Sequence, residues 1–295
     1  MDNKLSLGYS TCPNDTFIFD AMVHHKIDTE GLEFSPFLGD VEELNKKAFN
    51  QELDITKLSY HAYAFLSEFY MILDSGSALG KGNGPLLLSK KKLYPGELKE
   101  AKIAIPGKYT TANLLFGIAY PKLVNKKEYL FSDIEEAILS GEVDAGLAIH
   151  ENRFTYKSKG LHKIIDLGEY WEDLSNSPIP LGGIMIQRKF PDELIKTVNR
   201  VMKRSIKFAF ENKQEVMPYV RKYAQEMDES VMMKHIGLYV NDFTRDLGRE
   251  GKSAIKRMYK IAGAKKLIPQ LPQTLFVSDL KYDPPSQPTG RHNDH

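Results

Sequence analysis

The stretch LSLGYSTCPNDTFIFDAM, residues 5–22, decides the type of fold. Its first five residues alternate between apolar and small or polar side chains, which is the pattern of a strand with one buried face. Turn-forming residues follow directly, and Asn14 or Asp15 is predicted to cap the apolar helix that comes next. A strand that leads straight into a helix is the opening unit of an α/β fold.

The same unit then repeats along the chain. The patterns predict a strand at Leu32–Leu38, followed by a helix over Val41–Phe49 with Asp40 as its cap. They then predict a second strand at Asp54–Leu58 and a second helix over Tyr60–Phe69, which Ser59 opens. Strands separated by helices are typical of a parallel sheet, because a parallel connection needs a long crossover. A mainly parallel sheet covered by helices is therefore expected.

The pattern restarts beyond the glycine-rich segment Gly76–Gly84. Further strands are predicted at Tyr70–Leu73, Pro85–Ser89, Lys102–Ile105, near Glu128–Phe131, at Val143–Ile149 and at Leu181–Gln187, with a helix over Ala112–Tyr120. The last part of the chain is predicted to be helical and to wrap the lobe that contains the N-terminus, over Pro191–Phe210, Lys213–Gln225, Ser230–Tyr239 and Lys252–Ala264.

This order predicts an α/β protein with two lobes, the second inserted into the first, each a mainly parallel sheet flanked by helices. Residues 1–90 and 185–277 are assigned to the first lobe, 91–184 to the second, and the polar, proline-rich residues 278–295 to a disordered tail. By analogy, two crossings between lobes indicate a type-II periplasmic-binding-protein-like fold. Ligands of such sheets lie beyond the carboxyl ends of the strands, so a ligand cleft is expected between the lobes.

Composition and charge argue against several classes of protein. Forty Lys and Arg against 39 Asp and Glu leave a formal charge of +1, which gives no field for binding nucleic acid or an anionic membrane. No apolar run approaches the ~18 residues of a membrane span, and the first residues lack the apolar core of a signal peptide. Cys12 stands alone, so no internal disulfide forms. We expect a cytoplasmic protein.

Small polar residues begin helices at the ends of three predicted strands. They are Asn14-Asp15-Thr16, Lys57-Leu58-Ser59 and Thr110-Thr111. Unpaired N–H groups and the helix dipole make such turns suitable for anions, and Lys57 adds a positive charge. Each turn by itself would be an ordinary helix cap. Three of them at strand ends in two lobes favour a site for a carboxylate.

His150 follows the predicted strand Val143–Ile149, where the chain would enter the cleft. A lone histidine is more often structural than catalytic, but a strand end that faces the cleft favours a general base. In the next segment Arg153 and Tyr156 could line the cleft or hold the loop, and the residues leave both alternatives open.

Two other patterns do not lead to a site. Gly80-Lys81-Gly82 lacks the Ser or Thr and the spacing of a phosphate loop or a dinucleotide fingerprint, so Gly76–Gly84 is interpreted as a flexible loop. His24-His25 has no second ligand pair at a metal-binding distance along the chain, so no metal is expected.

Four longer motifs, taken together, resemble one known family. They are Cys12-Pro13-Asn14-Asp15-Thr16-Phe17-Ile18-Phe19, Thr56-Lys57-Leu58-Ser59-Tyr60, Ile105-Pro106-Gly107 with Thr110-Thr111-Ala112, and Ile149-His150-Glu151-Asn152-Arg153-Phe154-Thr155-Tyr156. In this order they resemble the 1,4-dihydroxy-6-naphthoate synthases of the futalosine route to menaquinone. The similarity covers about residues 4–277, and it departs from the family at Thr11, where proline is typical, and in the tail.

The resemblance implies a carbon–carbon lyase. Its reaction would convert cyclic dehypoxanthinyl futalosine into 1,4-dihydroxy-6-naphthoate and release dihydroxyacetone. The family's base maps to His150, and its substrate contacts map to Lys57, Leu58, Ser59, Thr110 and Thr111. The implied partner is a small carboxylated substrate, with neither a metal nor an organic cofactor.

Two other functions share the expected architecture. One is a non-catalytic solute-binding protein for a small carboxylate, which the missing signal peptide and the strand-end histidine disfavour. The other is the sister enzyme of the same route that dehydrates chorismate, which the fold supports equally and only the motifs disfavour. The oligomeric state does not follow from the sequence.

Overall fold

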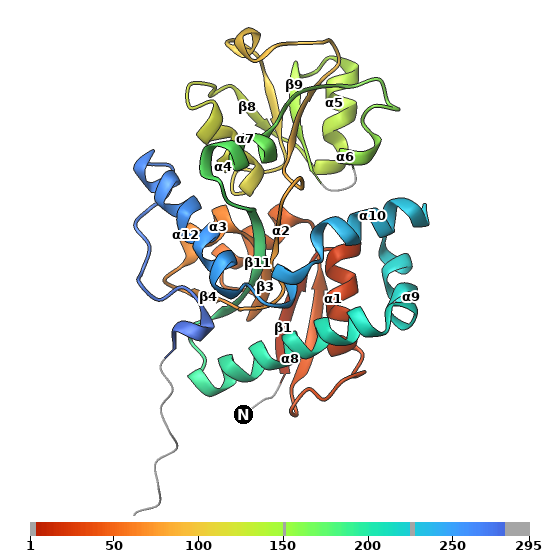
Figure 1. The fold of residues 1–295 in the computed structure, drawn as a ribbon, viewed down its shortest axis with the longest axis vertical. Helices are drawn as coiled ribbons and strands as arrows, with labels where there is room; N and C mark the ends of the chain where they lie inside the picture. Colours follow the sequence, from red (N-terminus) through yellow and green to blue (C-terminus); the bar gives the residue numbers. More distant parts are fainter. Residues whose placement is uncertain (1–3, 150–151, 225–227, 281–295) are drawn as a thin grey trace, which may run out of the picture.

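The computed structural model describes residues 4–149, 152–224 and 228–280, which form two lobes stacked along the long axis of the molecule (Figure 1). The larger lobe contains the N-terminus and the helices of the C-terminal third. Two segments cross between the lobes, the one that leads from β5 into β6 and the one that leads from α7 into β11.

The sheet of the larger lobe has the strand order β2-β1-β3-β11-β4, with β5 paired to β11. These strands are β1 (Lys4–Tyr9), β2 (Glu33–Leu38), β3 (Ile55–Ser59), β4 (Tyr70–Ile72), β5 (Ala78–Gly80) and β11 (Ile179–Gln187). Leu5, Leu7 and Tyr9 are all buried in one core, which confirms the alternation predicted for the first strand.

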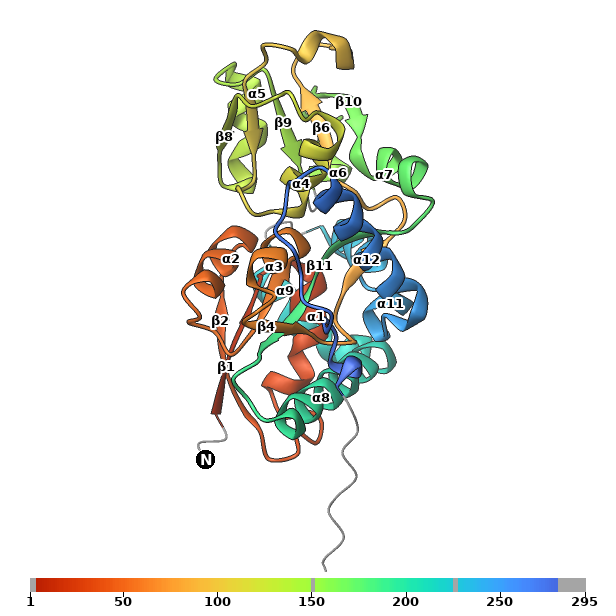
Figure 2. The same ribbon diagram turned by 90° about the vertical axis from the view of Figure 1, so that its left-hand side faces the viewer.

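Helices cover both faces of this sheet (Figure 2). One face shares an apolar core with α1 (Pro13–Val23), α8 (Asp192–Glu211), α9 (Lys213–Tyr223) and α10 (Glu229–Tyr239). The other face is covered by α2 (Val41–Phe49), α3 (Tyr60–Leu66) and α12 (Gly248–Ala264), and the short α11 (Asp242–Arg245) and η3 (Val277–Asp279) complete the lobe. The predicted wrapping of the first lobe by the late helices is confirmed. Within the described ranges, no helix combines the length and apolar character that crossing a membrane requires.

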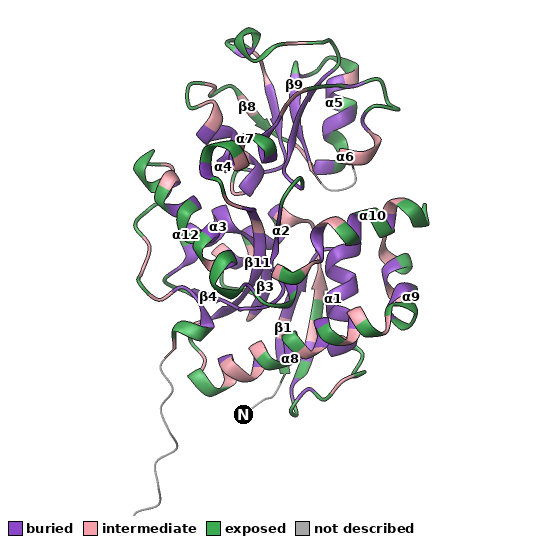
Figure 3. Cartoon of the chain, in the orientation of Figure 1, coloured by how far each residue is buried: buried purple, intermediate pink, exposed green. Residues whose placement is uncertain are grey.

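The smaller lobe has the strand order β10-β6-β9-β7-β8. Its strands are β6 (Leu86–Ser89), β7 (Ile103–Ile105), β8 (Lys126–Glu128), β9 (Ala145–Ala148) and β10 (His162–Asp166). α4 (Thr111–Ala119) and α7 (Leu167–Ser175) pack on one face and α5 (Ile134–Ser140) on the other, with η1 (Pro95–Leu98), η2 (Phe131–Asp133) and α6 (Asn152–Thr155) in the connections. The strands of both lobes are mostly buried between their helices (Figure 3).

The α/β class with helix-flanked sheets is confirmed, but neither sheet is mainly parallel. β1 pairs in parallel with β2 and β3, whereas β11 is antiparallel to β3, β4 and β5. In the smaller lobe β7 is parallel to β8 and β9, whereas β6 is antiparallel to β9 and β10. β11 brings the chain back from the smaller lobe. It therefore enters the first sheet beside the carboxyl end of β3 and runs antiparallel to that strand. The parallel expectation was therefore wrong for the strands next to the crossings.

Two strands lie on the other side of the predicted lobe boundaries. Leu86–Ser89 falls within residues 1–90, assigned to the first lobe, yet it pairs in the second sheet. The strand Ile179–Gln187 begins inside residues 91–184, assigned to the second lobe, yet it pairs in the first sheet from its first residue. Each strand follows a segment that crosses between the lobes, and local composition does not tell which sheet the next strand joins.

β10 and α7 are elements that the sequence patterns did not predict. β10 is an edge strand with His162 and Lys163 exposed, so its alternation is weak. α7 did carry a signal, because Asp166 caps it by accepting hydrogen bonds from the N–H groups of Gly168 and Glu169.

Both ends of the expected organisation need a correction. α1 begins two residues earlier than an Asn14 cap would allow, with Cys12 at the cap and Pro13 at the first helical position, where the missing N–H of proline costs no helical hydrogen bond. At the other end, part of the predicted tail belongs to the fold, because η3 includes residues 278–279 and Leu280 packs on the core of the larger lobe. Residues 281–295 lie outside the described part of the chain.

Candidate active site

A cavity opens between the two sheets, with walls from both lobes. It encloses about 720 Å³ when the open space at its mouth is counted. Its walls are Ser10, Asn14, Asp15, Val41, Lys57, Leu58, Ser59, Ala78, Asn83, Pro85, Thr110, Thr111, Ala112, Ile149, Leu181, Gly182 and Tyr239.

The structure brings the predicted substrate-binding residues to this one cavity. Lys57, Leu58 and Ser59 line it from the end of β3, and Thr110 and Thr111 line it from the start of α4. Their roles in binding stay predictions. His150, the predicted base, lies outside the described residues, and Ile149 immediately before it lines the cavity.

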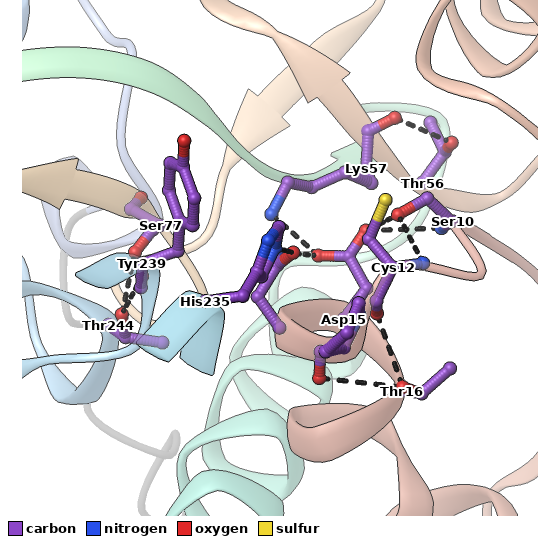
Figure 4. Close-up of polar contacts among 12 residues, drawn as sticks. Ser10, Cys12, Asp15, Thr16, Thr56, Lys57, Ser77, His235, Tyr239 and Thr244 are labelled. Carbon is purple, nitrogen blue, oxygen red and sulfur yellow. Dashed lines mark hydrogen bonds and ion pairs between the residues drawn. The ribbon is translucent and has the colours of Figure 1, made fainter. Parts of the chain in front are cut away.

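Lys57 is not the free cation that the sequence suggested. Its Nζ lies 2.9 Å from Oδ1 of Asp15, and the two residues are only 8% and 1% exposed. Oδ1 of Asp15 also accepts from the Asn14 amide at 2.7 Å, and Oδ2 accepts from the Ser10 N–H and hydroxyl (Figure 4). A buried carboxylate held by these donors neutralises Lys57, so the pair presents no net charge to the cavity.

The motifs missed a histidine behind this ion pair. His235 on α10 is buried, and its Nε2 donates at 2.8 Å to Oδ1 of Asn14, the neighbour of Asp15 in the chain. Asn14 therefore links α10 to the Asp15 carboxylate. Since 221 positions separate Asn14 from His235, no local pattern could have joined them.

The hydroxyl groups at the start of α4 are already engaged within the protein. Thr110 donates to the Gly107 carbonyl and accepts from the Asn113 N–H, while Thr111 donates to the Leu181 carbonyl at 2.5 Å. Thr111 and Ala112 occupy the first two helical positions, whose N–H groups have no acceptor inside a helix. An anion in the cavity would meet these N–H groups and the positive end of the helix dipole.

Ser59 lines the cavity, and its hydroxyl donates to no acceptor within the described part of the chain. Its N–H donates to Oδ1 of Asn45 at 3.1 Å, and its hydroxyl oxygen accepts from Nδ2 of Asn45 at 3.3 Å. Asn45 is itself held by Glu42 at 3.1 Å. With the oxygen of Ser59 accepting, its hydroxyl hydrogen remains available to a ligand.

Arg153 holds the loop and does not line the cavity. Its guanidinium donates to the Gly84 carbonyl and pairs with Oδ2 of Asp166 at 2.6 Å. Tyr156 is likewise buried, in the apolar core of the smaller lobe. The sequence left open whether these two residues line the cleft or hold the loop. Their contacts favour holding the loop for both residues.

His61 joins the two lobes beside the cavity. It lies on α3, and its Nδ1 is 3.1 Å from the Thr110 carbonyl oxygen, which can only accept, so Nδ1 carries the hydrogen. Burial lowers the pKa of His61 to about 4. At neutral pH the ring is therefore uncharged.

We expect His61 to make the protein less stable as the pH falls from about 6.5 to about 4. In this window the unfolded chain binds a proton that the folded chain excludes, so lower pH favours unfolding. The interval between the two pKa values corresponds to about 3 kcal/mol. Urea unfolding of the wild type and His61→Asn at about pH 7 and about pH 4.5 measures it. The variant keeps a donor near Nδ1 but does not titrate, so it should lose less stability; equal losses would contradict this account.

In the parts of the chain that the structure describes, no group of three or more His, Cys, Asp and Glu side chains is arranged to hold a metal ion. The chemistry of the cavity walls is that of hydrogen-bond donors, one buried ion pair and apolar side chains.

Comparison with known proteins relates this chain to one family over nearly its whole length. Residues 5–264 match the family described as menaquinone biosynthesis. The 1,4-dihydroxy-6-naphthoate synthase of Thermus thermophilus is 41% identical over 273 residues, which are 92% of this chain and 99% of the relative.

Solved structures agree with this relationship. Protein AF1704 from Archaeoglobus fulgidus superposes with a TM-score of 0.85 at 39% identity, over 90% of this chain and 99% of that one. The alkanesulfonate-binding protein SsuA from Xanthomonas axonopodis pv. citri reaches a TM-score of 0.69 at 14% identity, over 94% and 97% of the two chains. That second likeness concerns the fold alone and confirms the periplasmic-binding-protein-like architecture.

The fold is shared with a solute-binding protein, so fold similarity does not separate an enzyme from a binding protein. Sequence identity does separate them here, because it is high and spans both lobes. This chain belongs to the menaquinone biosynthesis family.

Proposed function

We propose that this chain is a 1,4-dihydroxy-6-naphthoate synthase, a carbon–carbon lyase that converts cyclic dehypoxanthinyl futalosine into 1,4-dihydroxy-6-naphthoate and dihydroxyacetone. The observation that carries the proposal is that all four sequence motifs supply a wall of the same cavity. Asn14, Lys57, Thr110 and Ile149 represent one motif each. The name of the Thermus relative supports the same reaction.

The substrate carboxylate binds at the start of α4 in this proposal. The N–H groups of Thr111 and Ala112 face no acceptor within the helix, and the hydroxyl hydrogen of Ser59 is available across the cavity. Asp15 is neutralised by Lys57, so it does not repel a second carboxylate. A single full charge on the ligand can therefore be held by dipoles rather than by a free cation.

His150 is proposed as the general base. It removes the proton of a substrate hydroxyl, whose C–O bond becomes a carbonyl as the neighbouring carbon–carbon bond breaks. The electron pair of that bond passes to the ring portion, which takes the proton back from the protonated base and becomes aromatic as the naphthoate forms. Contacts between lobes, such as Thr111 to the Leu181 carbonyl, support a site screened from bulk water.

Purified protein and cyclic dehypoxanthinyl futalosine test the proposal directly. We expect the naphthoate and dihydroxyacetone to appear in equal amounts, measured by liquid chromatography and an enzymatic dihydroxyacetone assay. Chorismate is the control substrate and should not be dehydrated. Absence of naphthoate, or turnover of chorismate instead, would refute the assignment.

A further inference from the structure

Asn83 is a buried wall of the cavity whose side chain has no hydrogen-bond partner among the residues that the structure describes. The residue is 1% exposed and lies between β5 and β6, where the chain crosses from one lobe to the other. Neither its amide nitrogen nor its amide oxygen bonds to any residue that the structure describes. The sequence had placed Asn83 in a segment interpreted as a flexible loop.

The segment around Asn83 is in fact held in place by the smaller lobe. The N–H of Gly82 donates to Oε1 of Glu172 at 2.7 Å, and the Gly84 carbonyl accepts from Arg153. Gly84 also packs directly on Gly168, since a Cβ added to Gly84 would lie 2.3 Å from the Gly168 Cα. Contacts on both sides of Asn83 therefore hold its backbone at the cavity wall.

A buried amide with no partner is unfavourable for the free protein, because both polar atoms lose their bonds to water. Nearly all buried polar groups in folded proteins have a partner, so the exceptions at a cavity wall indicate a group that a ligand or water completes. An amide presents a donor and an acceptor side by side. A hydroxyl group matches both, because it donates and accepts, whereas a carboxylate can only accept.

We infer that Asn83 binds the hydroxyl-bearing part of the substrate, the part that leaves as dihydroxyacetone. This inference rests on the proposed function. The carboxylate is assigned to Thr111 and Ala112 at the start of α4, and Asn83 lies on the segment that crosses from β5 to β6, at another wall of the same cavity. Together they orient the substrate, with its anionic end toward the helix and its hydroxyl end toward the amide.

The variant Asn83→Ala tests this role by separating substrate binding from stability. KM for cyclic dehypoxanthinyl futalosine should rise about 10- to 100-fold with little change in kcat, as expected for two lost neutral hydrogen bonds. The inhibition constant of 1,4-dihydroxy-6-naphthoate should not change, because that product lacks the leaving fragment. The melting temperature of the free protein should not fall, because the amide has no partner there.

Two further variants keep the test decisive. In Asn83→Leu the new side chain has a similar volume but no polar atoms. The same rise in KM in this variant would exclude the empty space left by alanine as the cause. Asn199→Ala is the matched control, since Asn199 bonds Asp74 away from the cavity, and it should lower the melting temperature without changing KM.

Each outcome bears on a different statement. A wild type that forms no naphthoate would overturn the proposed function, and this inference with it. If the wild type forms naphthoate and the Asn83→Ala variant has an unchanged KM, this inference alone would be overturned. Water would then be the hydrogen-bond partner of the Asn83 amide.

Discussion

Replacing His150 by asparagine should lower kcat for naphthoate formation by about 10²–10⁴-fold, the usual contribution of a general base. Asparagine preserves polarity and approximate size but cannot accept a proton from a substrate hydroxyl. Ile149, which precedes His150 in the chain, lies immediately after β9 and lines the cavity. Because binding is assigned to other walls, KM should change far less than kcat.

Steady-state kinetics with cyclic dehypoxanthinyl futalosine measure both constants. His162→Asn is a matched control, because His162 is an exposed histidine on the edge strand β10 and should leave kcat unchanged. Exogenous imidazole offers a second readout, since a small base that enters the cavity should restore part of the activity of His150→Asn. A fully active His150→Asn variant would refute the mechanism and leave the assignment of substrate open to separate tests.

Lys57→Met should destabilise the fold by about 3–5 kcal/mol, the cost of leaving a buried charge without its partner. The Asp15 carboxylate would keep its bonds from Ser10 and Asn14 but lose the cation at 2.9 Å. The double variant with Asp15→Asn removes both charges and should recover most of this stability. The sequence alone suggested that Lys57 binds the substrate. The buried ion pair predicts instead that the main effect of replacing Lys57 is a loss of folding stability.

Urea unfolding of the two single variants and the double variant gives the coupling energy of the pair. Lys163→Met is the control, because Lys163 pairs with Glu169 at 3.6 Å on the exposed edge of β10 and should hardly affect stability. Single and double variants that are equally unstable would contradict a coupled pair. So would a Lys57→Met variant as stable as the wild type.

Much of the fold could be predicted because its signals are local. Asp40 caps α2 with bonds to Glu42 and Glu43, two and three residues away, and the helix spans the predicted residues. Thr110 caps α4 in the same way through Asn113. Such contacts depend only on neighbouring residues, so the pattern of residue types is sufficient.

The functional residues were found in part for the same reason. Turns at strand ends mark Lys57, Ser59 and Thr110, and all three line the cavity. Asn83 was missed because a glycine-rich segment looks flexible until the contacts of its neighbours Gly84 and Gly82 with Arg153 and Glu172, 69 and 90 positions away, are known.

By itself the sequence determined the alternation of strands and helices, the two-lobed α/β class and the turns from which the cavity is built. Only the tertiary structure decided the direction of β11, the sheet that β6 joins, the partner of Lys57 and the unpaired amide of Asn83. The physical reason is distance along the chain. Asp15 and Lys57 are 42 positions apart, and Asn14 and His235 are 221 apart, so their contacts arise from packing that no local pattern specifies.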